Sequence, residues 1–409
     1  MKMRKQLLSA ILASAMVCGV LAPTAVQAED YDLTLYSIDT TKANFDTWLA
    51  AAEEGTGLKI QVIAAPTDSD TRQQKITTLL STGDTSVDVF QVNDEMATAF
   101  KNTGWLEGLN DTVMTDDILN NFATGYVADM VTSADGQIIG VPSSRGYLAM
   151  WVNQQIMDEV GITSITNQEE FEAYLAAVSE KDGRYGYGGA WEKTYVFNEI
   201  AQFVNMFGGD YYDWTNEGNK KALEFMKKMV DNGWTSIDQL ADKYEQLNQK
   251  FIDGECGVVF MWGTGGDYAA ADMYGADKIH MVMIPTFEKA SVFTDSWSYV
   301  LNSASEHKEA AIKFLQWTAS PEGEQYGWTC YDGYPARSDV AETVVPEDNE
   351  IKTMYAQYAE NLEVHGRPML PQTMEFITEI GTLFQQYITE EITIDDFCEQ
   401  AQASVEANQ

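Results

Sequence analysis

The segment KITTLLSTGDTSVDVFQVND, residues 75–94, indicates most directly how this chain folds. Ile76, Leu79 and Leu80 recur at the spacing of one helix face, and residues 87–92 then form a short run rich in β-branched residues. A helix that leads into a buried strand is the second half of a β–α–β unit. The segment therefore predicts a parallel strand pair with a helix covering one face of the sheet.

The same alternation continues on both sides of this segment. Residues 33–38 and 58–65 favour strands, and the apolar spacing over residues 45–52 favours a helix between them. Toward the C-terminus the helices lengthen, residues 183–189 predict a loop because they are rich in Gly and Tyr, and almost everything past residue 350 favours helix. The pattern predicts an α/β fold of mainly parallel sheets flanked by helices, and the length favours two tightly joined lobes.

The N-terminus has the features of a secretory signal. Lys2, Arg4 and Lys5 precede an apolar run over residues 7–21, which is shorter than the ~20 residues of a membrane-spanning helix. Small residues lead up to Ala28, after which we expect cleavage. An uncleaved anchor, or a lipid anchor on Cys18, is an alternative that the sequence favours less, because the residues before this Cys match a lipobox poorly. We expect a protein that works outside the cytoplasm.

The charge balance excludes one large class of functions. The chain has 25 Lys and Arg against 63 Asp and Glu, which gives a formal net charge of −38. Such a chain repels nucleic acid and anionic membranes, which bind through cationic side chains. A hydrophobic content of 45% with 10 Trp, 20 Tyr and 17 Phe predicts a well-packed globular protein.

Neither the cysteines nor any sequence motif indicates a catalytic function. Cys256, Cys330 and Cys398 are widely spaced, so we expect three buried thiols, with a bridge from 256 to 330 as the alternative. The three histidines belong to no metal-ligand motif, and the sequence contains neither a nucleophile elbow nor a phosphate-binding loop with its Lys. We expect a binding protein, not an enzyme, without cofactor or metal.

Three tryptophans lie beside loop-forming residues instead of within helix patterns. Trp191 follows a Gly-Gly-Ala run, Trp262 precedes Gly263, and Trp297 follows Asp295. An indole face matches the C–H face of a sugar ring, while neighbouring polar side chains satisfy the hydroxyls. Simple core packing is the alternative for each of the three. Together they favour a neutral sugar as the ligand.

Five segments in a fixed order carry a resemblance to a known family. They are KITTLLSTG with VDVFQVND (75–94), GVP with YLAMWVN (140–153), FIDGECGVV (251–259), KEAAIKFL with SPEG (308–323) and GYPAR (333–337). This order resembles extracellular solute-binding protein family 1, the sugar-binding components of ABC importers, which are related to maltodextrin-binding proteins. Ser86 and Gly257-Val258 depart from the family pattern by small changes that leave the expected fold unaltered.

The resemblance implies a clamp of two lobes that closes on a sugar and delivers it to the permease subunits of an importer, with the binding protein as a monomer. Three chain crossings are then expected near residues 143–145, 260–262 and 318–321. The implied lobes are 29–143 plus 263–318, and 144–262 plus 319–409.

Ligands of open α/β sheets bind beyond the carboxyl ends of the strands, and this rule and the resemblance select the same candidates. For hydrogen bonds to sugar hydroxyls we expect Ser37, Asp39, Asn93, Asp94 and Asp295, with Thr264 beside them. For stacking we expect Trp191, Trp262 and Trp297, and then Tyr331. Arg145 is expected either to bind ligand or to tie the hinge, whereas Asp88 is expected to make a structural contact.

Three other functions remain open at this point. The same fold can bind a polyamine, an organic anion or a chelated metal. A secreted glycosidase would need only one well-placed carboxylate pair, and 63 acidic residues make such pairs uninformative. An adhesin or sensor-docking protein would share the ligand site without import.

Overall fold

The computed structural model describes residues 31–409 except 43, 123–124, 126–128, 182, 264, 332–333 and 344–349. The expected signal segment 1–28, its cleavage after Ala28, the alternative anchor at Cys18 and the candidate Thr264 lie outside the described residues. Within the described part, no helix combines the length and apolar character needed to cross a bilayer.

The first sheet has six strands in the order β10-β9-β3-β1-β2, and β4 pairs with β9. The pairs β1–β2, β1–β3 and β9–β10 are parallel, whereas β9 is antiparallel to β3 and β4. The strands are β1 (Leu33–Ser37), β2 (Ile60–Ala64), β3 (Val89–Asn93), β4 (Gly140–Tyr147), β9 (Ser291–Leu301) and β10 (Glu363–Gly366). The predicted β–α–β alternation of the first hundred residues is confirmed.

The helices around this sheet follow the predicted apolar spacing. In α1, Phe45, Trp48 and Ala52 are buried along one face, and the carboxylate of Asp68 caps α2 by accepting from the backbone N–H of Thr71 at 2.9 Å. Helices from much later in the chain complete this layer, because α12 and α13 both pack on α1. The helices are η1 (Asp39–Thr41), α1 (Phe45–Thr56), α2 (Ser69–Ser81), α3 (Asp94–Phe100), α4 (Asp116–Leu119), α12 (Lys308–Thr318), α13 (Pro321–Tyr331) and α14 (Ser338–Ala341).

The second sheet has four strands in the order β6-β7-β5-β8. They are β5 (Ala149–Asn153), β6 (Tyr185–Gly188), β7 (Cys256–Met261) and β8 (Ile279–Val282). The α/β class is confirmed, but this sheet is mixed, since β5 is antiparallel to both β7 and β8 and only β6–β7 is parallel. Its helices are α6 (Gln154–Val160), α7 (Gln168–Ser179), α8 (Phe197–Met206), α9 (Glu217–Asp231), η2 (Ile237–Ala241), α10 (Tyr244–Ile252), α11 (Gly265–Ala270), α15 (Glu350–Asn361), α16 (Thr373–Ile388) and α17 (Ile394–Ala407).

The predicted loop at residues 183–189 is wrong, because β6 occupies most of it. The two glycines inside β6, Gly186 and Gly188, are required by close packing and not by a turn. A Cβ at Gly186 would lie 2.4 Å from the Cα of Leu175 in α7, and one at Gly188 would lie 2.6 Å from the Sγ of Cys256 in β7. Glycine in a strand here marks the close approach of a helix and of a neighbouring strand.

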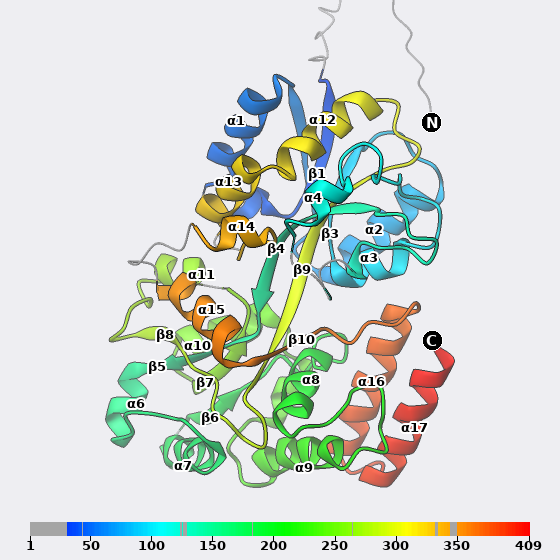
Figure 1. Cartoon of the computed structure of the whole chain (residues 1–409). Coiled ribbons are helices and arrows are strands. Elements are labelled where there is room, and N and C mark those ends of the chain that lie inside the picture. The colour runs from blue at the N-terminus through cyan, green and yellow to red at the C-terminus, as the bar shows by residue number, and fades with distance from the viewer. Residues whose placement is uncertain are drawn as a thin grey trace, which may run out of the picture. The chain divides into compact units, whose positions relative to one another are not determined.

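Two separate hydrophobic cores surround the two sheets, and two long strands connect them. On β4, Val141 belongs to the first core and Tyr147 to the second; on β9, Phe293 belongs to the second and Tyr299 to the first. Figure 1 shows β4 and β9 running side by side between the two groups of elements. Buried residues between 268 and 293, in a range expected with the first lobe, pack into the second core.

Four buried residues bear out structural expectations. Cys256, Cys330 and Cys398 are buried free thiols, as expected. Asp88 makes the expected structural contact, because its Oδ2 accepts from the backbone N–H of Thr34 at 2.8 Å and its Oδ1 from the hydroxyl of Ser305 at 2.6 Å.

Candidate functional site

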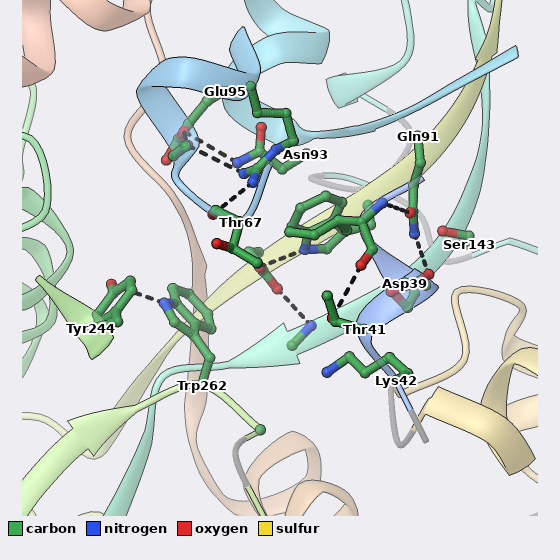
Figure 2. Close-up of a pocket in the computed structure, with 18 of the residues that line it drawn as sticks. Asp39, Thr41, Lys42, Thr67, Gln91, Asn93, Glu95, Ser143, Tyr244 and Trp262 are labelled. Carbon is green, nitrogen blue, oxygen red and sulfur yellow. Dashed lines mark hydrogen bonds between the residues drawn. The ribbon is translucent and has the colours of Figure 1, made fainter. Parts of the chain in front are cut away.

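A cavity of about 700 Å³ lies between elements of the two cores. One wall comes from η1, the start of α2, the junction of β3 with α3, and α13. The opposite wall comes from the starts of α8 and α10, the chain after β7, and α15. The connecting strands β4 and β9 line it between these walls. Figure 2 shows side chains from both walls pointing into the same space.

Two of the three predicted tryptophans, Trp262 and Trp297, line this cavity and remain partly exposed. The indole N–H of Trp262 donates to the phenolic oxygen of Tyr244 at 2.9 Å (Figure 2). The indole N–H of Trp297 donates to Oδ2 of Asp295 at 3.3 Å. Both polar ends are thus engaged by protein, which fixes the orientation of the two rings at the cavity wall.

An arginine lies over each of these rings. The guanidinium carbon of Arg72 is 5.4 Å from the ring centre of Trp297, and that of Arg367 is 5.7 Å from that of Trp262. Arg367 also donates from Nη1 to Oδ1 of Asp94 at 2.8 Å and from Nη2 to Glu95. These contacts place cationic donors and indole faces together, an arrangement in which each orients the other.

Asp295 belongs to the connecting strand β9 and faces the cavity. Its Oδ1 accepts from the backbone N–H of Gly146 at 2.7 Å, an approach that glycine permits, since a Cβ there would lie 2.5 Å from that oxygen. Burial raises the pKa of this carboxyl, and the charge of Arg367 opposes the shift. Asp295 is therefore a fixed acceptor at the centre of the site.

Asp39 lies at the other side of the cavity, in η1 just after β1 (Figure 2). The side-chain amide of Gln91 donates to it, and the hydroxyl of Ser37 donates to the amide oxygen of Gln91 at 2.6 Å. Burial raises the pKa of Asp39, while the hydrogen bond from Gln91 lowers it. Ser37 does not line the cavity; it orients the residues that do.

The two candidates at the end of β3 also differ in whether they line the cavity. Asn93 lines the cavity and also caps α3, with its Oδ1 accepting from the backbone N–H of Met96 at 3.2 Å and its amide donating to Glu95 at 3.1 Å. Asp94 is buried behind it and holds Arg367. The candidate Asp94 thus reaches the cavity only through the arginine that it orients.

Of the remaining candidates, one lines the cavity, one does not, and one has a side chain that the structure does not describe. Arg145 lines it, with its guanidinium 5.0 Å from the ring centre of Tyr334. Trp191 is fully buried in the second core, where its N–H donates to Glu199 at 2.9 Å, so its ring has no face open to a ligand. Tyr331 is the last residue of α13, and its side chain is outside the described part of the structure.

Several lining residues were not predicted from the sequence. Among them, Gln91 had a usable signal, because a polar residue inside an otherwise apolar strand is rarely buried without a role. The others gave no comparable signal, since they come from helix starts and loops that only the fold brings together. They include Arg72, Glu95, Tyr195, Lys243, Tyr244 and Arg367.

An ion pair crosses the cavity between its two walls. Nζ of Lys243, just before α10, lies 2.7 Å from Oδ2 of Asp68, the cap of α2. The hydrogen bond from Lys243 is the largest cause that lowers the pKa of Asp68 to about 2, with a further contribution from the backbone N–H of Thr71. The two walls are therefore joined directly at this edge of the cavity.

Comparison with known proteins shows the family of the chain that forms this cavity. The family described as "Bacterial extracellular solute-binding protein" matches residues 47–353. The chain belongs to this family. The resemblance drawn from the five sequence segments is thereby confirmed, as is an extracytoplasmic place of work for this solute-binding protein.

Relatives of this solute-binding protein share its fold at low sequence identity. It is 24% identical over 306 residues to an arabinooligosaccharide-binding protein of Halalkalibacterium halodurans, covering 67% of this chain and 66% of that protein, just under two thirds of its length. Maltose-bound MalE3 of T. maritima superposes with a TM-score of 0.78 at 17% identity, covering 92% of this chain and 99% of that one. A tagatose-bound ABC transporter solute-binding protein of Thermotoga lettingae gives 0.80 at 18%, covering 92% and 98%.

Proposed function

We propose that this solute-binding protein captures an oligosaccharide in the cavity between its two cores and delivers it to an ABC importer. The observation that carries the proposal is the joint lining of one cavity by the indole faces of Trp262 and Trp297 and by fixed oxygen acceptors. Sugars need both kinds of surface, because each ring has apolar C–H faces and a rim of hydroxyls.

The polar lining suits a ligand that both donates and accepts hydrogen bonds. Asp39, Asn93 and Asp295 supply acceptors or amide groups, and Arg145 supplies donors without an ion-pair partner among the described residues. A volume of about 700 Å³ is within the ~300–1,000 Å³ of sites that enclose drug-sized molecules. We infer that the ligand is larger than one sugar ring.

The two cores define the lobes that we propose to move. The first lobe contains β1 to β3 with α1, α2, α12 and α13, and the second contains β5 to β8 with α8, α10 and α16. The crossings in β4 and β9 act as the hinge. A sugar that touches both walls favours the closed form by the contacts that only this form provides, and the importer recognises that form.

The relatives support a sugar over the other ligand classes. The sugars that these proteins are described as binding are arabinooligosaccharide, maltose, tagatose and cycloalternan. We further propose that the chain acts without chemistry on its ligand, as a monomer, with its signal segment removed after Ala28 and permease subunits of the importer as its partners.

A thermal-shift screen tests the ligand class. Arabinose, arabinotriose, maltose, maltotriose and spermidine are each added to the purified protein. A ligand that binds only the native state stabilises it by mass action and so raises the melting temperature. The stabilisation is about 2.7 kcal/mol at a ligand concentration of 100 times Kd. We expect an oligosaccharide to give the largest shift. A shift with spermidine alone would favour a polyamine carrier, and turnover of chromogenic glycosides at enzymic rates would favour a glycosidase.

A further inference from the structure

Helix α13 carries two glycines on its cavity side, and only one of them is explained by packing. Gly323 and Gly327 are four residues apart and both line the cavity. A Cβ at Gly323 would lie 2.2 Å from the backbone oxygen of Trp317, so no larger residue fits there. A Cβ at Gly327 would meet no atom of the described residues within 4 Å, its own helix excepted.

Glycine at position 327 is therefore unfavourable for the helix without helping the packing. A glycine inside a helix costs about 1 kcal/mol relative to alanine, because it loses more backbone freedom. Its backbone torsion is not in the left-handed region that would require glycine. What the missing side chain at Gly327 does provide is open space in the cavity directly beside the helix.

Three residues of α13 and β4 that line the cavity each contain a buried polar atom without a hydrogen-bond partner in the described part of the structure. These atoms are Oγ of Ser143, Nε of Arg145 and Oε1 of Glu324. Glu324 is 2% exposed, and its other oxygen accepts from the backbone N–H of Ala336 at 3.1 Å, which fixes the carboxyl. Buried polar atoms without partners are costly unless a ligand satisfies them.

The charges near this region suit a neutral ligand. Arg145 and Glu324 are close enough for their charges to interact, and α13 packs on β4, which carries Arg145. Each has an unused polar atom, a donor on Arg145 and a carboxyl oxygen on Glu324 that accepts when ionised and can donate when protonated. A sugar ring with adjacent hydroxyls can accept from the first and exchange a hydrogen bond with the second.

We propose that the cavity region between α13 and β4 is the subsite for a terminal sugar ring, held by Ser143, Arg145 and Glu324, and that Gly327 determines which ring fits. The inference rests on the proposed function and deepens it. The open space beside Gly327 sets the bulk of this ring, so the position acts on specificity, whereas the rings of Trp262 and Trp297 contact the ligand elsewhere in the cavity.

The test compares wild type with Gly327→Leu, Gly327→Ala and Gln325→Leu by calorimetric titration. Gln325 is exposed on the same helix and does not line the cavity, so it gives a matched control. The probe is whichever of arabinotriose and maltotriose binds wild type more tightly. Filling the space with Leu should raise Kd by roughly tenfold or more, as forced overpacking does. Gln325→Leu should leave Kd unchanged, and Gly327→Ala should raise the melting temperature.

The melting temperature of each variant is measured alongside Kd, so loss of binding through misfolding is recognised. Should Gly327→Leu fail to fold, Arg145→Met takes its place, with the same tenfold loss expected. A Gly327→Leu or Arg145→Met protein that folds and binds as tightly as wild type overturns this subsite alone. Wild type that binds neither trisaccharide overturns the proposed function, and the subsite with it.

Discussion

Nη1 of Arg367 lies 2.8 Å from Oδ1 of Asp94, and both side chains are almost fully buried. A second branch of the same guanidinium reaches Glu95, and its carbon lies 5.0 Å from the ring centre of Phe197. Arg367 thus joins the segment after β10 to the start of α3 and to α8. The pair is the most strongly desolvated ionic contact of the cavity wall.

Replacing Arg367 by Met should lower the free energy of unfolding by about 3–5 kcal/mol, because it removes the cation that balances the charge of two buried carboxylates. Urea denaturation measures this. Arg184→Met is the matched control, since Arg184 pairs with the half-exposed Glu159, and such pairs contribute ~0–1 kcal/mol. Equal losses in the two variants would show that the buried pair has no special role.

The ion pair across the cavity should affect ligand binding more than stability. Lys243 and Asp68 are each about one third exposed, so Lys243→Met should change the free energy of unfolding by less than about 1 kcal/mol. The pair joins the two walls, and its loss should weaken sugar binding several-fold by disfavouring the closed form. Calorimetric titration of Lys243→Met beside Lys221→Met, which breaks an exposed pair with Glu288, decides it. Identical affinities would contradict this role.

Glu324 should make stability depend on pH. Burial raises the pKa of Glu324 to about 8, with the charges of Arg337 and Arg145 opposing it. The folded protein therefore holds this proton more tightly than the unfolded chain. The stabilisation is complete below pH ~4.5 and is lost as pH rises toward about 8, by about 1.4 kcal/mol for each unit of pKa difference.

Glu324→Gln should remove this part of the pH dependence, because the amide cannot ionise. Urea denaturation at pH 5, 7 and 8.5 compares it with Glu322→Gln, an exposed position on the same helix. Burial also raises the pKa of Glu199, to about 7, but Glu199 is present in both proteins, so the difference between wild type and Glu324→Gln isolates Glu324. If the stability of wild type falls no more than that of Glu324→Gln between pH 7 and 8.5, the assigned role of Glu324 is contradicted.

The sequence predicted the fold well where apolar spacing is local. Strands 33–38, 58–65 and 87–92 and the helices between them agree with β1 to β3, α1 and α2 to within two or three residues, apart from the end of α1 and the start of α2. It failed at residues 183–189, because the close approach of the Leu175 backbone to Gly186 is a packing contact between α7 and β6 that apolar spacing does not record.

The candidate site was predictable where polar residues follow strands. Asp39 and Asn93 lie at strand ends, Asp295 and Trp297 lie on β9, and all four line the cavity. Trp191 looked equivalent in the sequence, yet the carboxylate of Glu199 on α8 holds its N–H inside the core. Which side of a loop a tryptophan faces depends on such partners, and apolar spacing does not reveal them.

The most direct test of the account is a calorimetric titration of arabinotriose and maltotriose into wild type and Trp262→Ala. Loss of one stacked ring should weaken the tighter-binding trisaccharide by ~10-fold or more, because an indole face in a desolvated cavity contributes well over 1 kcal/mol. The melting temperature of the unliganded variant should stay close to that of wild type, since this side chain is partly exposed. Undiminished sugar affinity in a folded Trp262→Ala protein would contradict capture between the two walls.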